Sequence, residues 1–195
     1  GNLDAIEFFK HLNSVIRGRK DGTIIIAEES TAWPKITEAP EHDGLGFTYK
    51  WNMGWMNDTL AYIKTDPLFR CYDHHKLTFQ LTYIFSEHFI LPLSHDEVVH
   101  MKGSMISKMP GDYNQKFAGL RAYYLYMMTH PGKKLLFMGG EIGQFREWSE
   151  ARELDWSVLN YDNHQKLQRF VKELNCLYKK EKALFENEIN WDGFR

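Results

Sequence analysis

Short apolar runs alternate with amphipathic segments along this chain, and that alternation limits the folds open to it. The run T-I-I-I-A contains three consecutive Ile, which predicts a strand buried on both faces, as in parallel sheets. Strand-like runs begin at Thr23, Gly46, His88 and Lys133. Apolar residues spaced three and four apart predict helices over 3–19, 55–63, 114–129 and 162–182. The order predicts an α/β architecture with parallel strands and right-handed crossovers.

Two connections do not follow a regular period. The stretch 31–46 contains two Pro and two Gly and predicts a long loop. The stretch 74–88 has apolar residues without a clean repeat, and we expect one short helix and irregular chain there.

Polar residues gather where the predicted strands end. In a parallel barrel, the carboxyl ends of all strands meet at one rim, where ligands bind and reactions occur. One such residue alone could equally cap a helix or form a buried hydrogen bond, but several strand ends with polar residues favour a functional rim. The residues are Glu28, Glu29, Asn52, His95, Asp96 and Glu141.

The stretch I-L-P-L-S-H-D-E-V-V-H ends an apolar run on two His and two carboxylates, which could indicate a zinc site. A metalloprotease helix needs two His four residues apart, with Glu directly after the first. Here His95 and His100 are five apart, and Asp96 follows the first His. Pro92 also disfavours a helix leading into the motif. We therefore expect a strand end and no metal.

The composition excludes several classes of protein. The formal net charge of −2 leaves no electrostatic footprint for nucleic acid or for an anionic membrane surface. No apolar run is long enough to span a bilayer, and no signal peptide is visible. The two cysteines lie far apart, which favours free thiols in a reducing compartment, and we expect a cytoplasmic protein.

Aromatic residues make up 15% of the chain, which predicts an aromatic core or surfaces that stack on flat ligands such as sugars or bases. Glycoside chemistry needs two carboxylates around one bond, and the predicted rim supplies several. An ordinary α/β enzyme of another class stays possible at this point. Aromatic side chains next to the first two strands are Trp33, Phe47, Tyr49, Trp51 and Trp55.

Longer segments resemble one family throughout the chain. A-E-E-S-T, G-L-G-F-T-Y-K-W-N-M-G-W-M-N-D-T-L, L-P-L-S-H-D-E-V-V-H and K-K-L-L-F-M-G-G-E-I-G-Q are similar to bacterial glycogen branching enzymes, as are M-P-G-D, R-E-W and L-D-W. The resemblance covers essentially the whole chain in the same order. It implies a (β/α)₈ barrel of the α-amylase clan, here about half a barrel with strands five to eight, and no cofactor.

The resemblance also implies roles for single residues. Glu28 matches the general acid/base at the end of strand five, although the residues alone do not distinguish it from Glu29. Asp96 matches the transition-state stabiliser at the end of strand seven, and His95 matches a ligand of sugar hydroxyls. The expected substrate is an α-glucan such as glycogen or amylose, which we expect to contact Trp33, Trp51, Asn52 and Trp55.

The family's nucleophilic Asp lies in a segment like G-F-R-V-D, and no such segment occurs here. Asp4, at the start of a predicted helix, is a poor substitute. We therefore expect a fragment that is inactive alone, with residues 1–185 in the barrel and 186–195 starting a linker to a β domain. Exposed barrel edges predict a homodimer. The alternatives are an α-amylase-type glucan hydrolase and a non-catalytic glucan-binding module.

Overall fold

Four strands form one parallel sheet in the computed structural model, which describes residues 2–194. They lie side by side in chain order, so the predicted parallel α/β architecture is confirmed. Because all four strands run in one direction, their carboxyl ends share one edge of the sheet. The strands are β1 (Ile26–Ala27), β2 (Tyr49–Trp51), β3 (Phe89–Leu93) and β4 (Lys133–Leu136).

The predicted helices are confirmed to within a few residues at each end. Local capping explains two of the starts: Asn52 Oδ1 accepts a hydrogen bond from Trp55 N at 2.9 Å, and Asp112 forms a reciprocal capping box with Gln115. The helices are α1 (Leu3–Arg19), α2 (Met53–Lys64), α3 (His75–Thr78), α4 (Tyr113–Thr129) and α5 (Asp162–Lys180).

Short 3₁₀ helices fill the connections, as the irregular sequence between the periodic segments predicts. The β1–β2 connection contains one such turn and no α-helix. The turns are η1 (Pro40–His42), η2 (Pro67–Asp73), η3 (Phe79–Thr82), η4 (His95–Val98), η5 (Ile106–Lys108), η6 (Trp156–Asn160), η7 (Lys182–Leu184) and η8 (Trp191–Gly193).

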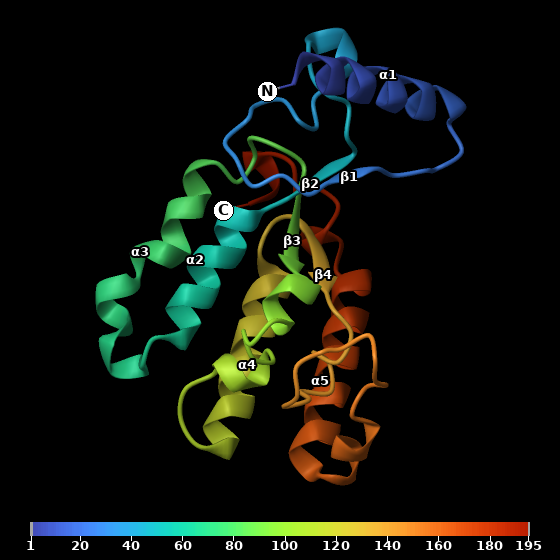
Figure 1. Cartoon of the computed structure of the whole chain (residues 1–195). Coiled ribbons are helices and arrows are strands. Elements are labelled where there is room, and N and C mark those ends of the chain that lie inside the picture. Colours follow the sequence, from blue (N-terminus) through green and yellow to red (C-terminus); the bar gives the residue numbers. More distant parts are fainter. Residues whose placement is uncertain (1, 195) are drawn as a thin grey trace.

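The main core lies where α2, α4 and α5 pack against β3. Leu91 and Leu93 of β3 are fully buried there, together with Leu120 of α4 and Leu167 of α5. Figure 1 shows these helices gathered at one end of the molecule, away from α1. Burial of each such side chain stabilises the fold by about 2 kcal/mol, so this core holds the end of β3 in place.

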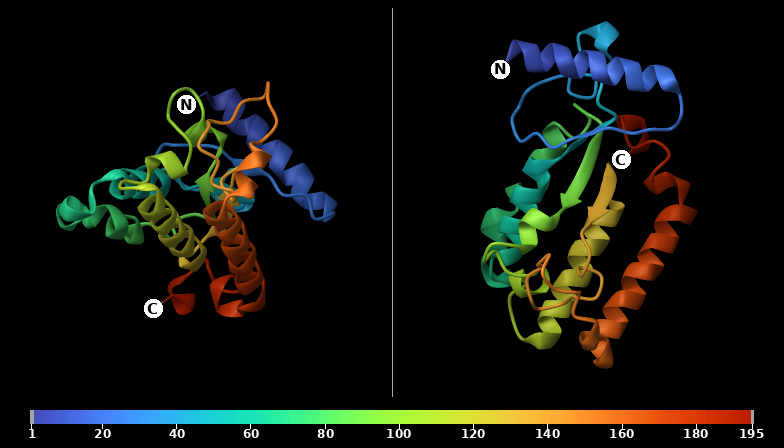
Figure 2. Two further views of the ribbon diagram at one scale, coloured as in Figure 1. Left: turned by 90° about the horizontal axis from the view of Figure 1, so that it is seen from below. Right: turned by 45° about the vertical axis from the view of Figure 1, so that its right-hand side comes forward.

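A second, smaller core lies under α1. The Phe9 ring packs 5.4 Å from that of Phe47, and Asn13 Nδ2 donates to the carbonyl oxygen of Leu45 at 2.7 Å. Both contacts join α1 to the loop between β1 and β2. Figure 2 shows α1 lying across one end of the molecule beside that loop. The loop is therefore held by contacts distant in sequence, although it contains no α-helix.

The first strand departs from its sequence prediction. Ile24 and Ile26 are 57% and 39% exposed, whereas Ala27 is buried and Ile25 is half-buried. The prediction of burial on both faces is therefore wrong. Side chains alternate between the faces of a strand, and residues 2–194 cover only one face of β1.

Residues near the end of the described chain pack back onto β4 and onto the turn that precedes β3. Lys133 of β4 forms an ion pair with Glu188, and the rings of Phe85 and Trp191 meet edge to face at 4.9 Å. The proposed role of residues 186–195 as the start of a linker stays a prediction. Within residues 2–194, no helix is both long and apolar enough to cross a membrane.

Candidate active site

The sequence places two adjacent glutamates at the end of β1, and the sheet register separates them. Ala27 pairs with Lys50, so the next residue, Glu28, falls beside Trp51. Successive residues point to opposite faces of a strand. Glu29 therefore lies on the face of Ala27 and Lys50, which are both buried, and we call this the outer face. Glu28 lies on the opposite face, with Ile26, and we call this the inner face.

Glu29 is engaged on the outer face. Lys50 Nζ lies 2.8 Å from Glu29 Oε2 and donates a second hydrogen bond to the Thr31 carbonyl oxygen at 2.9 Å. Burial of Glu29 opposes its ionisation, but hydrogen bonds from Lys50 and Thr31 outweigh burial and lower its pKa below the ordinary value. Glu29 is thus a structural anion, while Glu28 is exposed.

His95 and Asp96 stand on the turn that follows β3. Their side chains are each about half exposed, and His95 Nε2 lies 3.4 Å from Asp96 Oδ1. Because β1 and β3 are two strand positions apart, their carboxyl ends are separated by about 10 Å. Glu28 and Asp96 thus both follow strands that end at the carboxyl edge of the sheet.

A buried carboxylate supports the His95–Asp96 turn. Glu97 Oε2 accepts hydrogen bonds from both the amide and the hydroxyl of Ser94, each at 2.7 Å, and Ser94 Oγ accepts from Asp96 N at 3.3 Å. Ser94 and Glu97 are both buried. Sequence reasoning missed Glu97 as a site residue, although the pattern S-x-x-E around it is a capping-box signature that could have indicated this role.

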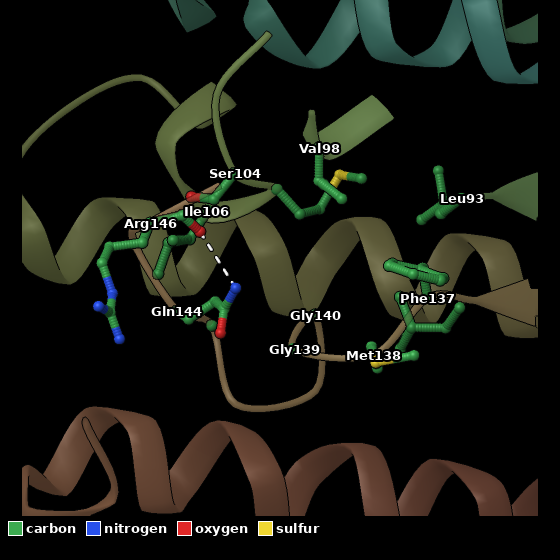
Figure 3. A pocket seen from close by; sticks show the side chains of 13 residues that line it. Leu93, Val98, Ser104, Ile106, Phe137, Met138, Gly139, Gly140, Gln144 and Arg146 are labelled. Atoms are coloured by element: carbon green, nitrogen blue, oxygen red, sulfur yellow. Dashed lines mark hydrogen bonds between the residues drawn. The ribbon is translucent and has the colours of Figure 1, made fainter. Parts of the chain in front are cut away.

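A hollow beside Phe137, which packs against His95, is too small for a sugar. Figure 3 shows it between the end of β3 and the chain after β4, bordered by Leu93, Val98, Phe137 and Gln144. Its volume of ≈ 20 Å³ suits about one water molecule. The His95 ring packs 5.9 Å from the Phe137 ring, which orients the imidazole at the rim. Any sugar at this rim therefore lies on an open surface formed by the described residues.

Three of the predicted sugar-binding residues line a different cavity. Trp33, Trp51 and Asn52 border a space of ≈ 550 Å³ together with Glu29 and Lys50. Trp33 is 43% exposed, whereas Asn52 is buried and caps α2. Neither Glu28 nor Asp96 borders this cavity. The structure thus divides the predicted site residues between two places.

Trp55 lies neither at the rim nor in the cavity. Its side chain is 0% exposed and is stacked between helices, with ring centroids 6.0 Å from Tyr123 and 6.4 Å from Tyr126. A side chain without accessible surface cannot contact a sugar, so Trp55 is removed from the candidate site. Its burial follows from the phase of α2, which turns Trp55, Thr59 and Ile63 toward the core.

Comparison with curated proteins relates the whole chain to one group of enzymes. It is 58% identical over 194 residues to the 1,4-alpha-glucan branching enzyme GlgB of Pseudomonas putida, and 59% identical over 193 residues to that of Halothermothrix orenii. The chain belongs to the 1,4-alpha-glucan branching enzyme family. These matches cover 100% and 99% of the chain but only 26% and 31% of the relatives' lengths. No protein-family model matches the chain.

The structural comparison agrees on the fold of this branching-enzyme segment. The debranching enzyme of Nostoc punctiforme superposes with a TM-score of 0.64 at 16% identity, over 91% of this chain and 38% of that structure. At this identity the likeness concerns the fold alone. The four strands and their helices are part of an α-amylase-type (β/α)₈ barrel, as the resemblance in sequence predicted.

Proposed function

We propose that this chain supplies the acid/base half of an α-1,4-glucan branching site, with Glu28 as general acid/base and Asp96 as transition-state stabiliser. The supporting observation is that both carboxylates lie at the carboxyl edge of one parallel sheet, while Glu29 is paired with Lys50 on the outer face. Barrel enzymes place their chemistry at this edge.

In the proposed reaction, Glu28 protonates the leaving glycosidic oxygen while a carboxylate outside this sequence attacks the anomeric carbon. Glu28, now a base, takes the proton from the 6-hydroxyl of an acceptor chain, which displaces the enzyme carboxylate and forms an α-1,6 branch. Two displacements retain the anomeric configuration. Asp96 and His95 hold ring hydroxyls as positive charge develops on the sugar. No cofactor takes part in these steps.

A chimera tests this proposal. Residues 2–194 replace the matching segment of the Halothermothrix orenii branching enzyme, which shares 59% identity with them. We expect the chimera to branch amylose, measured by loss of iodine absorbance and by α-1,6 linkages in the product. Glu28→Gln should lower the rate at least about a thousandfold. The leaving oxygen would lose its proton donor, and the 6-hydroxyl of the acceptor chain would lose its base. A folded chimera that keeps its rate after Glu28→Gln contradicts the assignment.

The same chimera separates transfer from hydrolysis. A branching enzyme passes the glucan chain to a sugar hydroxyl, whereas an amylase passes it to water. Release of reducing ends without new α-1,6 linkages would therefore favour the hydrolase alternative. The isolated 195-residue chain should make no branches, because its sequence lacks the G-F-R-V-D-type segment that holds the nucleophile in the family.

We also propose that the isolated chain self-associates through its inner face. Ile24 and Ile26 expose apolar surface there, and β1 and β4 each have one neighbour in the described sheet. Unpaired strand edges and apolar surface favour pairing with a second chain. Sedimentation at micromolar concentration should give a dimer, and a stable 23 kDa monomer would count against the proposal.

A further inference from the structure

The cavity of ≈ 550 Å³ lies where the helical layer of the barrel has a gap. The connection from β1 to β2 contains only η1, so no α-helix of its own covers this part of the sheet. Lys50 and Phe89 border the cavity, and the register pairs Lys50 with both Phe89 and Ala27. The cavity therefore opens at the outer face, where Glu29 and Lys50 lie, and Trp51 also borders it, whereas Glu28 does not.

Aromatic side chains form much of its wall. The rings of Phe79 and Tyr83 meet edge to face at 6.0 Å, and those of Tyr83 and Phe89 at 6.2 Å. Phe79 is 60% exposed and Trp33 is 43% exposed, from separate segments that both border the space. Apolar faces of this kind suit a ligand with flat apolar surfaces.

The polar groups in the cavity favour a neutral ligand with hydroxyls. Lys50 and Glu29 neutralise each other, and the Glu87 carboxylate already accepts from Ile36 N, Thr37 N and Thr37 Oγ. Lys35 also borders the cavity, so its two acidic and two basic side chains sum to no net charge, which favours a neutral ligand. Lys50 uses two of its three N–H donors in its contacts with the described residues.

We propose that this cavity binds two or three glucosyl units of an α-1,4-glucan, as an anchoring site separate from the rim of Glu28 and Asp96. Its volume lies in the range typical of small-ligand sites. The apolar faces of the sugars pack on Trp33 and Phe79, and one hydroxyl accepts the third N–H of Lys50. Only the choice of the α-1,4 linkage rests on the proposed function. The cavity would hold a glucan chain while another part of it reaches the rim.

Calorimetric titration of the 195-residue chain with maltohexaose tests the proposal, with the β-linked cellohexaose as a ligand control. We expect saturable binding of maltohexaose that Trp33→Ala weakens at least about tenfold, because one stacking face is lost. Ser86→Phe places a ring in the cavity and should abolish binding. Trp156→Ala removes an exposed tryptophan outside the cavity and should leave the affinity unchanged. Circular dichroism shows whether each variant is folded.

The rim provides the contrasting variant. His95→Ala tests binding at the rim instead, because His95 does not border the cavity. Loss of binding with His95→Ala but not with Trp33→Ala would place the sugar at the rim and overturn the cavity proposal, while leaving the proposed function intact. Absence of maltohexaose binding at millimolar concentration overturns it as well. Equal affinity for cellohexaose would overturn the α-1,4 selectivity.

Discussion

Glu28 and Glu29 are neighbours in sequence, yet they occupy two environments that differ in every property relevant to function. Glu28 is exposed on the inner face, at the rim that also presents Asp96. Glu29 is bound by Lys50 and Thr31 on the outer face, beside an aromatic cavity. Since the alternation of a strand imposes this division, one step along the chain separates an exposed carboxylate from one held by an ion pair and hydrogen bonds.

The difference also concerns how each face is supported. The outer face is backed by helices and by hydrogen bonds between residues more than twenty apart in sequence, such as Lys50 with Glu29 and Asn13 with Leu45. The rim is supported locally, by the Ser94–Glu97 capping box at the end of a strand buried in the main core. Substitutions at the rim should therefore change activity more than stability, and substitutions on the outer face should do the reverse.

The largest expected effect is at the rim. In the chimera with the Halothermothrix orenii enzyme, Asp96→Asn should reduce the branching rate by about a thousandfold, or about 4 kcal/mol of transition-state stabilisation. The Asp96 side chain is 44% exposed, so the free energy of unfolding should change by less than about 0.5 kcal/mol. The branching rate and the free energy of unfolding by denaturant, measured for the parent and the variant, check these two expectations. A loss of activity that follows a loss of stability would contradict the division between the faces.

The adjacent glutamates offer the next largest effect, measured on the 195-residue chain itself. Glu29→Gln leaves the Lys50 ammonium buried without its countercharge and should lower the free energy of unfolding by about 2–3 kcal/mol. Glu28→Gln, on an exposed side chain one residue away, is the matched control and should change it by less than about 0.5 kcal/mol. Equal effects in denaturant titrations would show that the two residues do not differ as described.

The pH dependence should distinguish the same pair. The pKa of Glu29 is lower in the folded chain than its ordinary value of 4.5. Its ion pair therefore stabilises the fold above about pH 4.5, and this contribution is lost as the pH falls through the folded pKa. The difference in stability between the parent chain and Glu29→Gln should be full at about pH 7 and shrink toward about pH 3. A constant difference across this range would exclude ionisation as its cause.

Much of the fold could be predicted because each element carries a local signal. The helices followed from apolar spacing, and the β3 strand from its continuous apolar run. Burial on both faces was predicted wrongly for β1, because the sequence does not say which neighbours cover a strand. The barrel itself followed from the resemblance in sequence, and the strand order agrees with it.

The site was less predictable, for physical reasons that individual residues show. Lys50 and Glu29 are 21 positions apart, and no local pattern joins them. Trp55 was predicted to bind sugar near the rim, but the helical repeat of Trp55, Met56, Leu60 and Ile63 already indicated a buried face. Tryptophan is both a core residue and a sugar-binding residue, so its type alone does not decide between these roles.

The smallest expected effect tests the local support of the rim. Ser94→Ala removes the hydroxyl that accepts from Asp96 N and donates to Glu97, and it should lower the free energy of unfolding by about 1 kcal/mol. Glu97 keeps the Ser94 amide as a partner, which limits the loss. The control is Ser14→Ala, which removes an exposed hydroxyl bonded within α1 and should have almost no effect.

The rate measurement then decides what the capping box is for. In the chimera, Ser94→Ala loosens the turn that carries Asp96, so kcat should fall about tenfold, because Asp96 is then misplaced relative to the transition state. Ser94→Thr retains the hydroxyl and should restore most of the rate. If Ser94→Ala lowers stability but leaves kcat at the parent value, the capping box stabilises the fold without positioning Asp96, and the rim's local support is structural alone.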